Sequence, residues 1–200
     1  MTWILTASGR AFDLQLASPD SIDLGDIATA LSKINRFGGH TSRLYSVAEH
    51  SIHVSRILED HLAIGHPAAL MAALMHDAHE AYVGDLATPL KDVLGPAWSA
   101  VESRIEHQVL RKFGVSAAAH AWRGHIKQAD LLALATERRD LLPVGGPAWP
   151  CLHTIAPLES LDLRRSSYRP DDWRDAFCDR FDELNVALAE AREALCQTTP

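Results

Sequence analysis

Apolar side chains recur every three or four residues along most of this chain, which is the spacing of one face of an α-helix. This spacing predicts helices over approximately residues 23–37, 45–65, 67–82, 96–113, 116–142 and 170–196. Between Trp3 and Leu14, two apolar runs are separated by a short turn at Gly9. This pattern predicts a β-hairpin. We therefore expect an all-α fold, a compact helical bundle with a small N-terminal hairpin.

Glycine and proline mark the ends of these predicted helices. Gly38-Gly39 ends the first helix, and Pro67 suits the first turn of the third helix. Residues 83–89 break the helical period, and residues 143–150 are rich in Pro and Gly, which predicts an excursion over the surface. No repeat, low-complexity tract or linker divides the chain, so we expect a single domain over residues 1–200.

The third predicted helix ends in a concentration of polar groups. Residues 70–75 are wholly apolar, and His76, Asp77, His79 and Glu80 follow immediately. Imidazoles and carboxylates carried into a core cost several kcal/mol unless they are paired, hydrogen-bonded or bound to a metal. His76-Asp77 therefore needs partners from elsewhere in the chain, and the ordinary alternative is a satisfied buried ion pair.

Two such partners stand out. His50 lies beside the apolar positions Val47 and Val54 and should face inward, and Asp130 interrupts an apolar helical stripe. Three helices would thus bring two imidazoles and two carboxylates together: His50, His76, Asp77 and Asp130. This donor set suits one divalent ion of Zn, Mn, Co, Fe or Ni, with positions left open for water and substrate.

Other residues near this cluster suggest acid–base and phosphate chemistry. Glu80 lies four residues after His76 and three after Asp77, so we expect it to overhang the same helical face and to reach a metal-bound water as general acid or base. Arg36, at the predicted end of the first helix, offers a planar fork that pairs bidentately with phosphate. Lys91 and Lys127 are further candidate phosphate contacts. The ordinary alternatives are surface charges at each of these positions.

The order His…His-Asp…Asp resembles the HD-domain metal-dependent phosphohydrolase superfamily. Longer strings resemble its small bacterial 5'-deoxynucleotidase branch: Arg36, Val47-Ala48-Glu49-His50-Ser51, Met75-His76-Asp77-Ala78-His79-Glu80 and Gly84-Asp85-Leu86-Ala87-Thr88-Pro89-Leu90-Lys91. The resemblance covers the HD core, about residues 27–140. It implies that His50, His76, Asp77 and Asp130 ligate one metal, and that Glu80, Asp85 and Arg36 surround the scissile phosphate.

The resemblance also implies a function. The expected activity is hydrolysis of nucleotides, foremost of the phosphomonoester of (deoxy)nucleoside 5'-monophosphates. One alternative is a dNTP triphosphohydrolase that releases tripolyphosphate on the same metal site, and another is a non-catalytic nucleotide sensor. The branch has Trp near the sugar where this chain has Phe37, and we interpret Gly38-Gly39-His40 as a wall of the pocket with His40 as a candidate base or phosphate contact.

Several polar residues remain outside this assignment. We expect His53 and His79 to lie near the site without ligating the metal. Dinuclear HD enzymes use additional histidines before the last Asp, where this chain has His107, His120 and His125, but the surrounding strings differ and one metal is preferred. The charged run at residues 137–140 is predicted to be a solvated surface.

The amino-acid composition limits the kinds of molecule that we expect the protein to bind. The 19 Lys and Arg against 26 Asp and Glu give a net charge of −7, which argues against binding to nucleic-acid polymers or anionic membranes and leaves a small-molecule nucleotide as the expected partner. Three scattered cysteines predict neither a disulfide framework nor a thiolate zinc site. Without a membrane-spanning run or secretion signal, we expect a cytoplasmic protein. We also expect a homo-oligomer.

Overall fold

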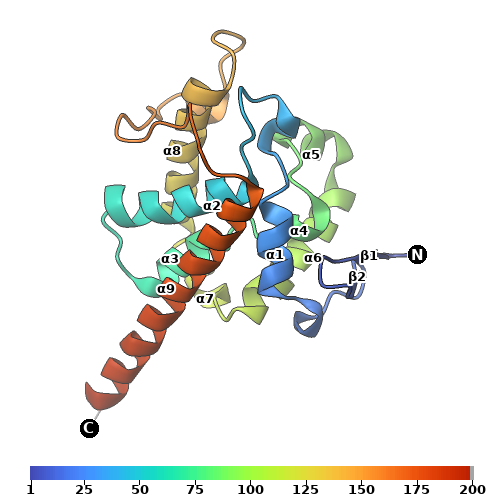
Figure 1. The fold of residues 1–200 in the computed structure, drawn as a ribbon, viewed down its shortest axis with the longest axis vertical. Helices are drawn as coiled ribbons and strands as arrows, with labels where there is room; N and C mark the ends of the chain where they lie inside the picture. The colour runs from blue at the N-terminus through green and yellow to red at the C-terminus, as the bar shows by residue number, and fades with distance from the viewer. Residues whose placement is uncertain (199–200) are drawn as a thin grey trace.

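The computed structural model describes residues 1–198 and confirms the all-α fold with a small hairpin (Figure 1). The helices in this part of the chain are α1 (Leu24–Leu31), α2 (Val47–Arg56), α3 (Pro67–Leu74), α4 (Glu80–Val83), α5 (Thr88–Leu94), α6 (Pro96–Lys112), α7 (Ser116–Ala121), α8 (Arg123–Leu141) and α9 (Pro170–Thr198). Short 3-10 turns cover Pro19–Ser21, Arg36–Gly39 and Pro150–Leu152. No helix within residues 1–198 is both long and apolar enough to cross a membrane.

The N-terminal hairpin pairs β1 (Trp3–Leu5) with β2 (Ala11–Asp13) in antiparallel register, with Ile4 opposite Phe12. Phe12 is fully buried and stacks on Tyr82 of α4, with ring centroids 3.9 Å apart. The hairpin is therefore attached to the short helix that follows the predicted site residues His76 and Asp77.

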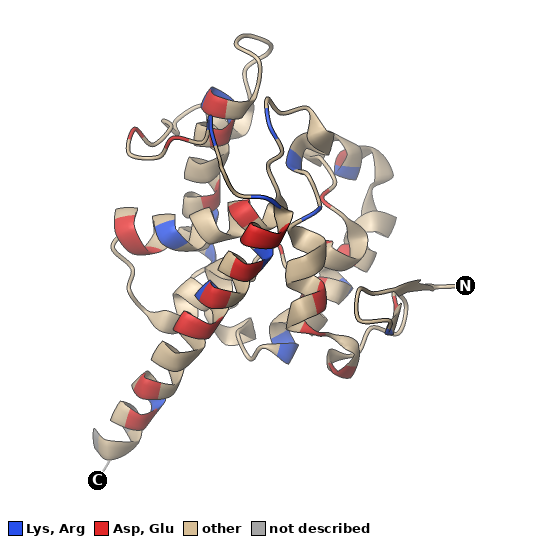
Figure 2. Cartoon of the chain, viewed as in Figure 1, with Lys and Arg blue, Asp and Glu red and all other residues tan. Residues whose placement is uncertain are grey.

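The long C-terminal helix α9 packs across α1, α2 and α3, and its C-terminal end extends beyond the body of the molecule (Figure 1). Phe177 and Leu184 of α9 are buried in the same core as the apolar residues of α3. On the exposed side of α9, acidic and basic residues are interspersed along the helix (Figure 2). The amphipathic pattern that predicted this helix therefore follows from its position against the core.

The substitution Phe177→Ala tests this packing. Phe177 is 0% exposed, so its truncation is expected to lower the free energy of unfolding by about 3–5 kcal/mol, the usual cost of emptying an aromatic site in a core. Urea denaturation followed by circular dichroism measures the change. Val186→Ala on the same helix is the control, because Val186 is exposed; an equal loss in the two variants would contradict this view of α9.

Four of the six predicted helices have other boundaries in the structure. The first helix ends at Leu31 rather than near Phe37, and Arg36 and Phe37 lie in a separate turn in which Phe37 has a left-handed φ of 57°. An isolated bridge between Asn35 and Ser46 closes this segment. The helix predicted over residues 116–142 is divided at Trp122 into α7 and α8. The second helix begins at Val47, capped by Ser46, and ends in a wider π-type turn over Ile57–His61.

The most consequential difference lies in the third predicted helix. α3 ends at Leu74, and turns carry the chain through residues 75–79 before α4 begins at Glu80. The Nδ1 of His76 lies 2.8 Å from the carbonyl oxygen of Ala73, a carbonyl near the end of α3. A side chain that bonds a nearby carbonyl in this way competes with continuation of the helix. The expectation that Glu80 shares one continuous helical face with His76 is therefore wrong.

Candidate metal centre

The structure brings the four predicted metal ligands together. His50 lies within α2, His76 and Asp77 lie in the turn after α3, and Asp130 lies on α8. His50 Nε2 is 3.4 Å from Asp130 Oδ1 and 3.5 Å from Asp77 Oδ2. His76 Nε2 is 3.1 Å from the same Asp77 oxygen. One ligand atom each of His50, His76 and Asp130 lies within 4.8 Å of the others, so this group can hold a metal ion.

The hydrogen bonds of the two imidazoles orient them for ligation. His50 Nδ1 lies 2.6 Å from Oε1 of Glu137, and His76 Nδ1 lies 2.8 Å from the Ala73 carbonyl oxygen. A carbonyl and an ionised carboxylate only accept, so in both rings Nδ1–H is the donor. The Nε2 atoms of His50 and His76 are both buried and have no hydrogen-bond partner among the described residues. In the neutral rings, each Nε2 therefore offers a lone pair to the cluster, and this arrangement fits a metal.

Glu137 also contacts the cluster, although the sequence pattern did not indicate it. It was predicted to lie on a solvated surface, but it is 0% exposed. Besides His50, it accepts hydrogen bonds from Tyr45 Oη (3.0 Å) and from Nη2 of Arg36 (3.2 Å). The available signal was its spacing, because Glu137 follows Asp130 by seven residues on α8 and so lies on nearly the same helical face. The neighbouring Asp140 is also largely buried and accepts from the Leu163 amide.

The electrostatics of the cluster are those of a buried charge network. Burial and the Arg36 charge oppose protonation of His50, but Glu137 and Asp130 outweigh them and raise its pKa to about 9, so a metal bound to Nε2 would displace the proton that this ring carries at neutral pH. Burial opposes ionisation of Glu137, yet Arg36 and His50 lower its pKa to about 2. Burial likewise disfavours the charged form of Asp77, but His76, His50 and Arg36 hold its pKa well below the usual range. The carboxylates are therefore ionised and available to a cation.

Arg36 is held inside this network rather than at a solvated helix end. Its side chain is 10% exposed, with Nη2 3.2 Å from Glu137 and Nη1 3.6 Å from Asp77. Burial disfavours its charge, but Glu137, Asp77 and Asp85 raise its pKa further above the usual value. The Phe37 ring lies beside it, with the guanidinium carbon 5.5 Å from the ring centroid. Arg36 therefore carries a fixed positive charge next to a predicted ligand.

Glu80 and Asp85, the predicted catalytic carboxylates, differ from the ligands in their protonation. Burial, with Asp77 and Asp85 nearby, raises the pKa of Glu80 well above its usual value. Its Oε2 is buried without a hydrogen-bond partner among the described residues. Burial also raises the pKa of Asp85, against the attraction of Arg36. Glu80 is thus a carboxyl group that keeps a proton beside ionised Asp77.

A pocket of about 600 Å³ opens beside the cluster and is lined by His76, Asp77 and Asp130. Lys91 and Lys127, the further candidate phosphate contacts, also line it. Lys91 Nζ lies 2.6 Å from Glu102 Oε1, and Lys127 Nζ lies 2.8 Å from Asp130 Oδ2. Glu102 of α6 lines this pocket together with His79, whose Nε2 is 3.7 Å from Glu102 Oε1.

The remaining predicted residues lie apart from the cluster. His40 is exposed and lines a different cavity, which contains none of the four predicted ligands. Phe37 lies between that cavity and Arg36, because its ring is 6.2 Å from the ring of Trp149 on the cavity wall. His107, His120 and His125 are not part of the His50–His76–Asp130 group.

The chain is similar in sequence to proteins of Escherichia coli and Rhodobacter capsulatus. No family model matches the sequence. It is 37% identical over 185 residues to a protein of Escherichia coli strain K12 named "Uncharacterized protein YfdR", which covers 92% of this chain and 97% of the relative. It is 34% identical over 146 residues to "Uncharacterized protein RCAP_rcc00048" of Rhodobacter capsulatus, covering 70% and 72% of the two chains. With this identity over nearly its full length, the chain belongs to the same protein family as YfdR of Escherichia coli.

Proposed function

We propose that this chain is an HD-domain metal-dependent phosphohydrolase that acts on nucleotides, foremost on the phosphomonoester of (deoxy)nucleoside 5'-monophosphates. One observation carries the proposal. The Nδ1–H groups of His50 and His76 are both bound to protein acceptors, so both buried Nε2 atoms are left facing the carboxylates of Asp77 and Asp130. Two imidazole nitrogens that converge with carboxylates on one point form the donor set of a metal site, and the bound Nδ1–H groups keep both rings oriented for ligation.

The four residues His50, His76, Asp77 and Asp130 would hold the ion, and nitrogen and carboxylate donors suit Zn, Mn, Co, Fe or Ni. A bound divalent ion would lower the pKa of a water molecule and withdraw charge from a phosphoryl oxygen. Glu137 fixes the His50 ring through a 2.6 Å contact and keeps its Nε2 directed to the cluster. The protein thus supplies an oriented site rather than a flexible group of ligands.

Glu80 is the residue suited to move a proton. Ester hydrolysis joins a water oxygen to phosphorus and releases the sugar oxygen, which needs a proton as it leaves. Because burial and its acidic neighbours raise the pKa of Glu80, this carboxyl group retains a proton that it can give to the leaving oxygen. Asp85, whose pKa is also raised by burial, is the second candidate for this step.

The cations around the pocket support the proposal that a phosphate binds there. Arg36 is held in place by Glu137 and Asp77, while Lys91 and Lys127 line the pocket itself. Besides these two lysines, Arg123 lines the same pocket. This additional charge favours the dNTP triphosphohydrolase as the second candidate, because a triphosphate presents more anionic oxygens than a monophosphate.

A substrate and metal screen tests the proposal. The chelator-treated protein is expected to be inactive, and addition of Mn, Co, Zn, Fe or Ni is expected to restore hydrolysis, with orthophosphate released from deoxynucleoside 5'-monophosphates. Chromatography of the products separates the reactions, because tripolyphosphate from dNTPs would identify the alternative enzyme. Release of no phosphate from any nucleoside mono-, di- or triphosphate with any of these metals would refute both, and tight binding without turnover would indicate a nucleotide sensor.

A further inference from the structure

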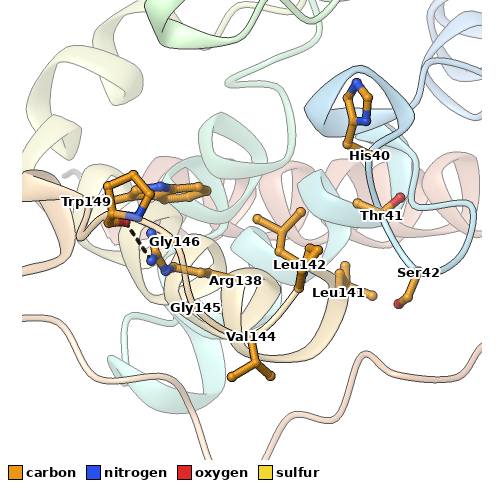
Figure 3. A pocket seen from close by; sticks show the side chains of 12 residues that line it. His40, Thr41, Ser42, Arg138, Leu141, Leu142, Val144, Gly145, Gly146 and Trp149 are labelled. Atoms are coloured by element: carbon orange, nitrogen blue, oxygen red, sulfur yellow. Dashed lines mark hydrogen bonds between the residues drawn. The ribbon is translucent and has the colours of Figure 1, made fainter.

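A second cavity, of about 710 Å³, lies at the C-terminal end of α8 (Figure 3). Its walls come from residues 40–42, from the end of α8 and from the loop at residues 143–149. The volume falls within the range of pockets that hold small organic ligands. It shares no lining residue with the pocket beside the metal cluster, so the phosphohydrolase chemistry described above leaves it unexplained.

One wall of this cavity is flat and rich in π electrons. The guanidinium carbon of Arg138 lies 4.5 Å from the centroid of the Trp149 ring, and Arg138 Nη2 donates to the Pro147 carbonyl at 2.9 Å. Figure 3 shows these two side chains together at one end of the cavity and His40 at the other. Arg138 Nη1 is buried without a hydrogen-bond partner among the described residues. The wall is thus a stacking surface in which one guanidinium nitrogen is buried.

Side-chain contacts connect this wall to the metal cluster. Trp149 lies 6.2 Å from Phe37, the Phe37 ring lies beside the guanidinium of Arg36, and Arg36 Nη1 lies 3.6 Å from Asp77. Along α8, Arg138 is eight residues beyond Asp130, which corresponds to about 12 Å of helix. This separation is comparable to the length of a nucleotide from its phosphate to the far edge of its base.

We propose that the cavity between residues 40–42 and 138–149 binds the nucleobase of the substrate, with Trp149 and Arg138 as the stacking surface. Bases stack on aromatic rings and on guanidinium planes, and their ring nitrogens and carbonyls accept hydrogen bonds. The cavity offers such a stacking wall. His40 then contacts the base rather than the phosphate. This inference deepens the proposed function and rests on it for the identification of the base as part of a substrate.

Nucleoside binding tests the inference separately from catalysis. The chelator-treated protein is titrated with 2'-deoxyadenosine and with 2'-deoxycytidine, which carry no phosphate, and binding is followed by saturation-transfer NMR. We expect saturable binding that Trp149→Ala weakens about tenfold, within the range found when a stacking aromatic is removed from a nucleic-acid site. Trp149→Phe keeps an aromatic ring and is expected to restore most of the affinity. In the hydrolysis assay, Trp149→Ala should raise KM and leave kcat nearly unchanged.

Trp3→Ala is the matched control, because Trp3 is a partly exposed tryptophan of the N-terminal hairpin, outside this cavity. The inference is overturned if the parent protein binds neither nucleoside, or if Trp149→Ala binds both as tightly as Trp3→Ala does. If no nucleotide is hydrolysed but nucleosides still bind through Trp149, the cavity stands as a nucleoside site and the proposed function fails. If hydrolysis proceeds and Trp149→Ala changes neither KM nor nucleoside binding, the proposed function stands and this inference fails.

Discussion

Asp77→Asn is expected to abolish hydrolysis and to remove most of the metal affinity. Oδ2 of Asp77 lies within 3.1 Å of His76 Nε2 and 3.5 Å of His50 Nε2, so it faces both imidazoles at the centre of the cluster. Asparagine keeps the shape but removes the negative charge that offsets a divalent ion. Changes to outer groups of metal sites typically cost about 10–100-fold, so loss of a direct ligand should cost on the order of 1,000-fold in activity.

Metal content, calorimetric titration and phosphate release measure the effect of Asp77→Asn. The matched control is Asp60→Asn, because Asp60 is an exposed carboxylate in the π-type turn after α2. Circular dichroism establishes that both variants are folded. Full metal stoichiometry and unchanged activity in Asp77→Asn would contradict the assignment of this residue as a ligand and would favour the buried ion pair.

Substitution of Glu137 should have the second largest effect, and it should act on both stability and metal binding. Glu137→Ala leaves the buried Arg36 without its closest anion and Tyr45 Oη without its acceptor. Removing one partner of a buried ion pair typically costs about 3–5 kcal/mol, and we expect a loss of this size in the free energy of unfolding. Metal affinity should fall about 10–100-fold, because the His50 ring loses the group that orients it.

Glu137→Gln separates the two effects. The glutamine carbonyl can still accept from His50 Nδ1, so metal affinity should fall less than in Glu137→Ala, while Arg36 still loses a charged partner. Urea denaturation and metal titration are compared with those of Glu190→Gln, an exposed position on α9. If Glu137→Ala were as stable as Glu190→Gln and bound metal equally well, Glu137 would have no role in positioning His50.

The long periodic helices could be predicted from the sequence because their apolar stripes are set by packing against one core. α6 and α9 begin at the predicted prolines, Pro96 and Pro170, and both lie within a few residues of the predicted ends. The positions at which a helix ends or divides were harder to predict. The end of α3 at Leu74 depends on the contact of His76 with the Ala73 carbonyl, and a bond between side chain and backbone leaves no mark on the apolar pattern.

The residues of the candidate site also divide into those that the sequence indicated and those that it did not. His50, His76, Asp77 and Asp130 could be identified from the sequence, because a polar group in an apolar stripe demands a partner wherever it occurs. Arg36 was also identified, but its environment was not, since its position in a turn depends on the bridge between Asn35 and Ser46. Glu137 was assigned to the surface, because a charged run is usually solvated and its contacts come from segments about ninety residues away or more.

The sequence by itself determined an all-α bundle and the residues able to form a metal cluster, since helical periodicity and buried polarity are local properties of the chain. Only the tertiary structure decided the orientation of that cluster. The Nδ1 contact of His50, the burial of Glu137 and the cavity beside Trp149 all arise where separate segments meet. Such contacts depend on the relative positions of α2, α3 and α8, and no spacing within a single helix specifies those positions.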